Sequence, residues 1–185
     1  MAWSVKMSRP RWEETMKTLC VGLVLVLVIT FAPPLLSFAD AQYPLSLSIT
    51  TNTGRFVEGS KLGVSVSIQN PGLPAVVDFY FGVVLPDGDT VVFFTDPFSF
   101  ASGVGSRANP ATLRPIVAEV DLTTPFTFGQ PTFFSLSYPG NGPYGLHYLF
   151  ISAVKSGALV DNVYEASDVL GSASFAVFIL APWDY

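Results

Sequence analysis

The side chains that could do chemistry in this chain are few and scattered. His147 is the single histidine, so a general base or a metal ligand would have to act without a second imidazole. It alternates with Leu146 and Tyr148 in an apolar stretch, which is typical of a histidine on the face of a sheet. No Gly-x-Ser-x-Gly motif accompanies it, and one histidine cannot form a histidine-rich metal site.

Carboxylates are more numerous, but no pattern in the sequence pairs them. A glycosidase needs two carboxylates that flank the scissile bond, whereas Glu58, Glu119 and Glu165 lie near separate turns or strand ends. Residues 103–106 share glycines with phosphate-binding loops but lack the lysine and the helix that must follow. The sequence therefore predicts no catalytic residue, no cofactor and no enzymatic activity.

Three aspartates are the candidate metal ligands. Asp87 and Asp89 flank Gly88, and Asp96 follows shortly after. Oxygen-rich turns can hold calcium, which takes about six to eight oxygen ligands. Asp-x-Asp in a turn more commonly stabilises the turn itself through hydrogen bonds to its backbone. We therefore predict no metal site and regard calcium as the one metal to test.

Aromatic side chains are the remaining candidates for a ligand site. Phenylalanine alone accounts for 16 residues, and most of these rings are expected to fill the core or plug hairpins. Ring faces in turns can stack on sugars or mark protein interfaces. The possible ligand-contact aromatics, which lie in turns or in the tail, are Tyr138, Tyr144, Trp183 and Tyr185.

The elements that must position these residues are short strands. Apolar residues alternate with polar ones, and proline, glycine and asparagine punctuate the pattern. The segments expected to be strands are 45–50, 62–69, 76–85, 90–95, 116–122, 132–138, 144–154 and 172–180. Residues 98–115 are the least regular, and 163–170 could form one short helical turn. Residues 76–85 are apolar on both faces, which predicts a strand covered on both sides.

About eight short strands separated by turns predict an all-β fold in which two sheets form an immunoglobulin-like sandwich of antiparallel strands. The antibody-type Cys-Trp-Cys signature is absent, so the packing of apolar side chains must hold the sheets together. The sandwich is expected to span residues 42–185, after a signal-peptide helix.

Several motifs in these turns resemble bacterial immunoglobulin-like domains of exported and cell-surface proteins. The motifs are Phe-Val-Glu-Gly-Ser-Lys-Leu at 56–62, Asn-Pro-Gly at 70–72, Asp-Phe-Tyr-Phe-Gly at 78–82, Leu-Pro-Asp-Gly at 85–88 and Gly-Pro-Tyr-Gly at 142–145. The resemblance covers most of residues 42–185 and implies the sandwich fold. It does not imply a particular ligand, because the motifs consist of residues that form turns and not of residues that bind a ligand.

Residues 1–41 have the features of an export signal. Basic residues precede an apolar run at 19–32, and Ala39-Asp40-Ala41 supplies the small residues of a cleavage site before Gln42. Cleavage after Ala39 is the close alternative, and an uncleaved membrane anchor is a second one. Because Met16-Lys17 has the form of a signal-peptide start by itself, an upstream mis-start is a further hypothesis for residues 1–15.

Charge and cysteine usage agree with an exported domain. Four of the nine basic and two of the fourteen acidic residues precede Thr18, so the rest carries a net charge near −7. An acidic domain without basic clusters is a poor partner for nucleic acid. The only cysteine, Cys20, lies in the apolar run, so no disulfide is expected in 42–185. The absence of disulfides favours a bacterial periplasmic or secreted protein.

The function expected from the sequence is that of a non-enzymatic interaction module outside the cytoplasm. Its partner would be a protein or a glycan of the cell envelope, and its only membrane contact would be the signal segment if uncleaved. A carbohydrate-binding module is one alternative. A self-assembling surface subunit is another, suggested by the apolar run at 175–180, which could exchange strands between copies.

Overall fold

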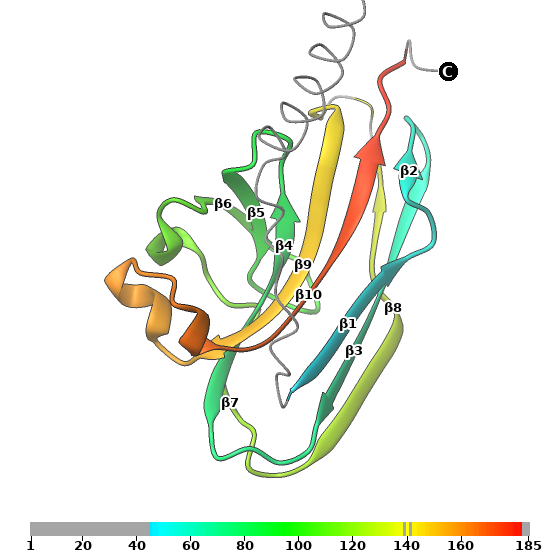
Figure 1. Ribbon diagram of the computed structural model, residues 1–185. Coiled ribbons are helices and arrows are strands. Elements are labelled where there is room, and N and C mark those ends of the chain that lie inside the picture. Colours follow the sequence, from blue (N-terminus) through cyan, green and yellow to red (C-terminus); the bar gives the residue numbers. More distant parts are fainter. Residues whose placement is uncertain (1–44, 139, 141, 183–185) are drawn as a thin grey trace, which may run out of the picture. The chain divides into compact units, whose positions relative to one another are not determined.

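The computed structural model describes residues 45–138, 140 and 142–182, and these form an all-β sandwich of two sheets (Figure 1). The predicted signal segment, residues 1–41, lies outside the described residues. Within the described part of the chain, no helix is long and apolar enough to span a membrane. The predicted all-β fold class is confirmed.

The smaller sheet, sheet A, contains three antiparallel strands. They are β1 (Ser46–Thr51), β3 (Lys61–Asn70) and β8 (Phe126–Ser137), with β3 in the middle. The predicted alternation fixes the register: Leu62, Val64, Val66 and Ile68 of β3 are buried, while the serines between them point outward. Because side chains alternate between the faces of a strand, one face of sheet A is apolar and the other polar.

The larger sheet, sheet B, contains seven strands. Its path is β2 (Arg55–Phe56), β10 (Val169–Ile179), β9 (Gly145–Lys155), β4 (Val76–Val84), β5 (Thr90–Phe94) and β6 (Ser102–Ser106), and β7 (Val117–Asp121) pairs with β4. Three short 3₁₀ helices lie in its loops: η1 (Pro110–Thr112), η2 (Ala158–Asp161) and η3 (Ala166–Asp168). All pairs are antiparallel except β2 with β10, which is parallel.

The strand order is that of an immunoglobulin-like sandwich. In that fold, strands A, B and E share one sheet with D, and strands C, F and G form the other. Here β1, β3 and β8 occupy the A, B and E positions, and β4, β9 and β10 occupy C, F and G. The D position beside β8 has no strand among the described residues.

A cluster of phenylalanine rings joins the two sheets at the centre of the core. Phe81 of β4 stacks on Phe94 of β5 with ring centroids 5.3 Å apart, and Phe94 lies 4.8 Å from the ring of Phe134 on β8. Phe81 also contacts Phe133 edge-on at 5.1 Å. Such pairs add about 0.5–1.5 kcal/mol each beyond the burial of their area.

A second apolar layer covers the outer face of sheet B. Tyr80, Val154, Leu159 and Val169 form one buried cluster there, and Val84, Val91 and Phe93 form another. The predicted covering of both faces of residues 76–85 is therefore confirmed for β4. Burial, with the Asp78 carboxylate nearby, raises the pKa of Tyr80 to about 12.

The structure departs from the predicted strands at three places. The described residues form ten strands, where about eight were expected. The two additional strands are β2, which is only two residues long, and β6, which lies inside the glycine-rich stretch taken to be irregular. Strand β8 begins at Phe126, six residues before the predicted start at 132, because Pro131 lies within the strand at a bulge. Of the helical turn expected at 163–170, only η3 forms.

The apolar run at 175–180 does not form a free terminal strand. Residues 175–179 belong to β10, which pairs with β9 along one edge and with the two-residue strand β2 at Phe178 and Ile179 along the other. Only Phe178 and Ile179 are paired along both edges, and strand exchange through this run stays a prediction.

Asn70 ties together the loops at one end of the sandwich. Its buried side-chain amide donates to the carbonyls of Leu122 and Thr124 at 2.8 and 2.9 Å, and its Oδ1 accepts from the Gly72 N–H at 3.1 Å. The turn after β3 and the loop before β8 are thus held by one side chain.

Replacing Asn70 by aspartate keeps the shape but removes both donors. The Leu122 and Thr124 carbonyls would then face a carboxylate, so we expect the free energy of unfolding to fall by at least about 1–3 kcal/mol. Urea unfolding of Asn70→Asp measures this. The matched control is Gln69→Glu, the same chemical change at an exposed neighbour, for which we expect less than about 0.5 kcal/mol. Equal effects of the two changes would contradict this role for Asn70.

Candidate functional site

The structure does not bring the three candidate calcium ligands together. Asp87 and Asp89 lie in the turn before β5, and Asp96 follows the opposite end of that strand. Each carboxylate is bonded locally: Asp87 accepts from the Thr90 hydroxyl and N–H, Asp89 from the Ser106 hydroxyl, and Asp96 from the Ser99 hydroxyl. The hydrogen bonds from Thr90 lower the pKa of Asp87, and those from Ser99 and Phe98 lower the pKa of Asp96.

The other acidic candidates are also dispersed. Glu58 lies in the turn before β3, Glu119 in β7, and Glu165 just before η3. No group of three or more His, Cys, Asp or Glu residues that could hold a metal ion occurs in the described ranges.

Two of the four candidate ligand-contact aromatics support the loop between β8 and β9. Tyr138 is buried in the core, and its hydroxyl donates to the Gly142 carbonyl at 3.1 Å. Tyr144 is partly buried, and its hydroxyl donates to the Gly140 carbonyl at 2.8 Å. The buried ring of Tyr138 has no open face for stacking on a ligand. The other two, Trp183 and Tyr185, lie outside the described residues.

His147 lies on the inner face of β9, in phase with the core residues Leu149 and Ile151. Only 4% of it is exposed. Its Nδ1 lies 3.0 Å from the Gly145 carbonyl oxygen, and because a carbonyl can only accept, Nδ1 carries the proton of the neutral ring. The position is that of the sheet-face histidine predicted from the alternation.

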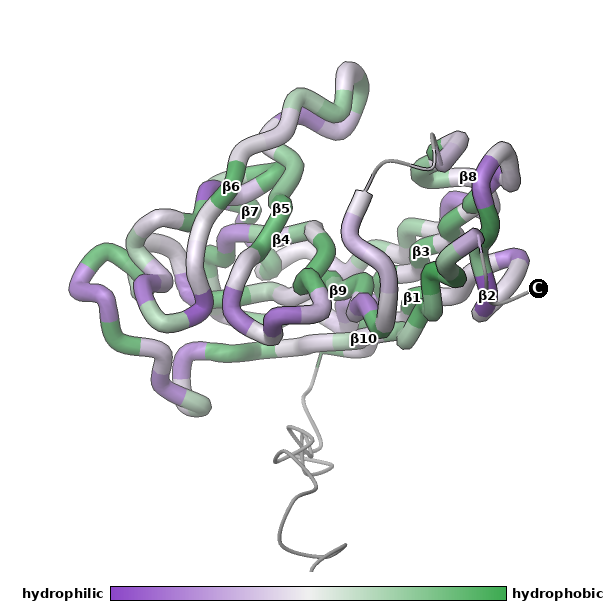
Figure 2. The backbone as a smooth tube through the Cα atoms, turned by 90° about the horizontal axis from the view of Figure 1, so that it is seen from above, coloured by the Kyte–Doolittle hydropathy of each residue, from purple (hydrophilic) through white to green (hydrophobic). Residues whose placement is uncertain are grey.

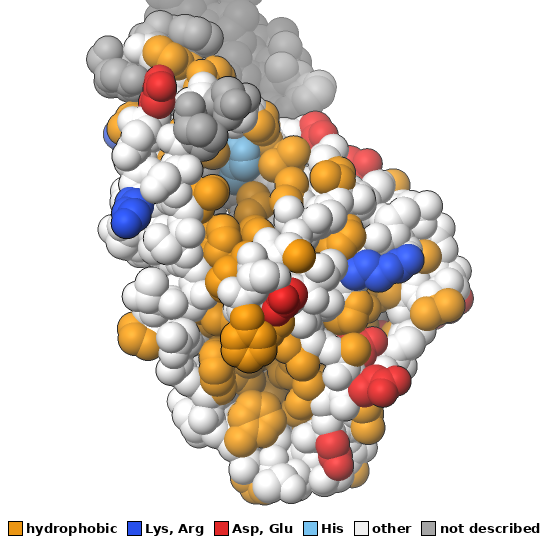
Figure 3. Space-filling view, turned by 180° about the vertical axis from the view of Figure 1, so that it is seen from behind, with side chains coloured by type: hydrophobic (Ala, Val, Ile, Leu, Met, Phe, Trp, Pro, Cys, Tyr) orange, Lys and Arg blue, Asp and Glu red, His pale blue; other side chains and the backbone are white. Residues whose placement is uncertain are grey.

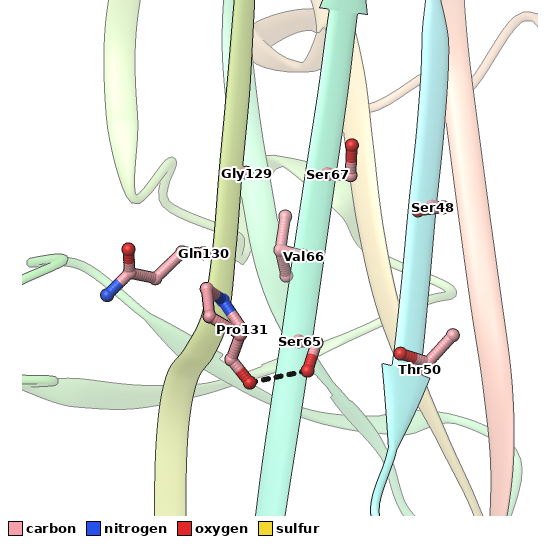
Figure 4. Close-up of a pocket in the computed structure, with 8 residues that line it drawn as sticks. All are labelled: Ser48, Thr50, Ser65, Val66, Ser67, Gly129, Gln130 and Pro131. Carbon is pink, nitrogen blue, oxygen red and sulfur yellow. Dashed lines mark hydrogen bonds between the residues drawn. The ribbon is translucent and has the colours of Figure 1, made fainter.

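The outer face of sheet A carries a shallow depression lined by small hydroxyl groups (Figure 4). Its volume is about 390 Å³. We call this surface the hydroxyl face; its lining residues are Ser48, Thr50, Ser65, Val66, Ser67, Gly129, Gln130 and Pro131. The Ser65 hydroxyl donates to the Pro131 carbonyl at 2.5 Å. The lining has no charged side chain and no aromatic ring.

A strip of hydrophobic side chains runs along the side of the sandwich where β8 ends sheet A. Figure 3 shows this face, with hydrophobic side chains gathered through its middle. We call it the apolar strip and define it by Phe98, Phe100, Val104, Phe128 and Phe133. Phe98 is 92% exposed, Val104 70% and Phe128 40%. Apolar patches of this kind on a soluble protein commonly mark interaction sites.

The loop between β5 and β6 presents two phenylalanines in opposite ways. Asp96 closes a turn by accepting from the Phe98 N–H at 2.8 Å, and its own carbonyl accepts from the Phe100 N–H at 2.9 Å. Phe100 has a φ of +51°, which is rare for a bulky side chain. This conformation directs its ring onto Phe133 and Phe134, at 5.7 and 5.0 Å, while Phe98 stays in solvent. Figure 2 places this loop on the same side of the sandwich as β8.

A bulge in β8 positions the other side of the strip. Val66 pairs with Gln130 and Val64 with Phe134, so three residues of β8 lie opposite Ser65 alone. A bulge re-aims the side chains of the strand that contains it. Phe133 as well as Phe134 therefore points into the core, and Phe128 contacts the ring of Phe133 at 6.4 Å.

The sequence predicted that most phenylalanine rings fill the core or plug hairpins, but it could not separate the buried rings from the exposed ones. Phe98, Phe100, Phe128 and Phe133 look alike in a sequence, and only the loop geometry and the bulge distinguish them. Val104 was missed because its neighbours Gly103 and Gly105 indicated a loop. Those glycines have a structural reason: a Cβ at Gly103 would lie 2.5 Å from a ring carbon of Phe93.

Comparisons with known proteins give only distant structural similarities. No family description and no curated protein matches the chain. A CARDB domain from Pyrococcus furiosus, solved by NMR, is 13% identical over 74% of this chain and 94% of that chain, with a TM-score of 0.34. A crystal structure of that domain with di-metal ions gives 0.35.

The sporulation control protein Spo0M from Bacillus subtilis is 10% identical and has a TM-score of 0.36. The match covers 75% of this chain and 50% of that chain. TM-scores this low say nothing about a ligand of this chain. The di-metal ions are those of the Pyrococcus domain.

Burial lowers the pKa of His147 below its ordinary value of 6.5. The unfolded chain therefore takes up this proton at a higher pH than the folded chain. We expect the free energy of unfolding to fall as the pH drops below about 6.5 and to level off below the folded-state pKa. Above that window both states are neutral, and the residue adds no pH dependence.

Urea unfolding between about pH 7.5 and pH 5 measures this effect. His147→Gln should flatten that part of the profile. If the variant retains the wild-type slope, His147 is not the group responsible.

Proposed function

We propose that this chain is a non-enzymatic interaction module that works outside the cytoplasm and binds a protein of the cell envelope through the apolar strip. The observation that carries the proposal is the solvent exposure of Phe98, Val104 and Phe128 on one side of an otherwise well-packed sandwich. Covering these side chains would remove apolar area from water, which is the main driving force of protein association.

The composition of β8 also supports a protein ligand. The strand Phe126–Ser137 contains no charged residue, and β1 contains none either. Charged residues are typically depleted in the centre of protein interfaces, and aromatic residues are enriched there. Phe98 and Phe128 have the character of the aromatic anchors that dominate binding energy in such interfaces.

The exported location rests on the sequence. The basic start, the apolar run and the small residues before Gln42 favour a cleaved signal, and the turn motifs resemble those of exported immunoglobulin-like domains. A periplasmic or secreted module with envelope partners agrees with both features.

The proposed role of the apolar strip predicts which substitutions weaken binding of the partner protein. We expect Phe98→Ser and Phe128→Asp each to weaken binding by at least about tenfold, because each removes an apolar anchor. The measurement is affinity capture from envelope extract with the purified protein, followed by the dissociation constant of each retained protein for wild type and variants.

Phe178→Asp is the matched control. Phe178 is also 40% exposed, but it lies on β10, which β9, β4 and β5 separate from β6. A partner whose binding falls with the strip variants and not with Phe178→Asp supports the proposal. A partner insensitive to both strip variants contradicts it.

A glycan ligand is the alternative, and the hydroxyl face is the surface that would suit it. Its uncharged serines and threonines could exchange hydrogen bonds with a neutral polysaccharide. Retention of a polysaccharide that is lost in Ser67→Arg and unchanged in Phe128→Asp would favour this function over the protein-binding one.

A further inference from the structure

Strand β8 has an unoccupied edge beside an apolar surface. Among the described residues it pairs with β3 along one edge and with no strand along the other. Alternate N–H and C=O groups of an edge strand point away from its sheet and can pair with an added strand. The apolar strip lies beside this edge, because Phe126 and Phe128 are on the inner face of the same strand, opposite Asn70 and Ile68.

Beyond the free edge of β8, sheet B extends further than sheet A. The ring of Phe134 on β8 lies over Phe81 of β4 and Phe94 of β5, so β8 covers these two strands. Strand β6 follows β5 and has no strand above it in the described part of the chain. Val104 of β6 pairs with Val92, which pairs in turn with Val83. Val83 is partly buried and packs against the core, so Val104 belongs to the inner face. Its exposure of 70% shows that this inner face is uncovered.

The uncovered area has the position of one missing strand. In the complete immunoglobulin-like arrangement, strand D lies beside strand E in the same sheet, and here β8 occupies the E position. A strand placed in position D would pair with the edge of β8 and lie over the inner face of β6. Its inward side chains would cover Phe128 and Val104.

The bulge determines how much of the edge can pair. Pro131 has no N–H, and residues 131–133 leave the regular ladder. The regular part before it, residues 126–130, is about 17 Å long at 3.4 Å per residue. It carries no charge, so a charged residue on an added strand would find no oppositely charged cross-strand partner there.

We infer that residues 126–130 of β8 bind an extended, uncharged segment of a partner protein, which adds to sheet A as its fourth strand with an apolar residue at every second position. Backbone hydrogen bonds to β8 supply affinity, and the alternate apolar side chains fill the strip between β8 and β6. The inference rests on the proposed function and specifies the kind of segment that the strip accepts.

A single strand fits this space better than a second copy of the chain. If two copies paired antiparallel through their β8 edges, around a two-fold axis perpendicular to the sheet, their B sheets would lie on the same side of the joined sheet. The β5 and β6 strands of each copy extend beneath the added strands, into the space that the other copy's sheet B fills. An isolated segment meets no such obstacle.

Strand β3 provides the probe, because it already pairs with the opposite edge of the same residues of β8. A synthetic peptide with the sequence of residues 63–70 is uncharged and alternates Val64, Val66 and Ile68 with serines. We expect it to bind the purified protein and to slow hydrogen exchange of the outward amides within residues 126–130. Titration calorimetry and exchange mass spectrometry measure the two effects.

Two N-methylated peptides test whether backbone pairing is used. One is methylated at the nitrogens of Val66 and Ile68, the other at those of Ser65 and Ser67. Alternate N–H groups of a strand point to opposite sides, so one peptide should lose binding and the other keep it. Equal binding of both peptides would overturn the inference.

Protein variants test the position of the strand. Phe128→Asp and Val104→Asp should each weaken peptide binding at least about tenfold, whereas Phe178→Asp should not change it. Val104 is the decisive position because it lies on β6, away from the edge that pairs. An unchanged affinity in Val104→Asp places the peptide elsewhere and overturns the inference.

The remaining outcomes separate this inference from the proposed function. If the peptide does not bind while Phe98→Ser and Phe128→Asp still abolish capture of a partner, the strip recognises a folded surface and only the inference fails. If sedimentation shows a dimer that Phe128→Asp dissociates, a second copy occupies the edge and the inference is wrong. If neither the peptide nor any partner depends on the strip, both proposals fail.

Discussion

The packing of phenylalanine rings between the two sheets is the interaction on which this sandwich depends. The described residues contain no cysteine, so no disulfide joins the sheets. Phe81 and Phe94 from sheet B meet Phe133 and Phe134 from sheet A, and Phe100 closes the group from the β5–β6 loop. The strained backbone of Phe100 is tolerated because the ring gains these contacts. The same rings continue outward to Phe128, so the core and the apolar strip are one structure.

The unequal width of the sheets explains why this continuation is open to solvent. A sandwich with equal sheets would cover the inner face of β6, but sheet A ends at β8. The acidic turns near β6 are closed by hydrogen bonds, as in the case of Asp89, which accepts from the Ser106 hydroxyl. The exposed apolar strip therefore follows from the number of strands in sheet A.

The fold was largely predictable because alternation and turn residues report directly on local structure. Residues 62–69 and 76–85 were placed within one or two residues of β3 and β4, and Asn70 was recognised as a turn residue. What the sequence could not supply were long-range effects. The bulge that extends β8 through Pro131 depends on its pairing with β3, and the glycines of β6 reflect the ring of Phe93. For the same reason, Tyr138 was a candidate ligand contact although it is buried, and Val104 was not considered although it is exposed.

Pro131 has a further consequence for the solubility of the protein. An uncharged edge strand of twelve residues, rich in phenylalanine, is the kind of segment that seeds cross-β aggregation when it is continuous. A proline and a bulge in the middle of such an edge prevent identical strands from stacking along its whole length. Pro131 thus leaves only the short segment before it able to pair, and it prevents the continuous pairing along β8 that a growing fibril requires.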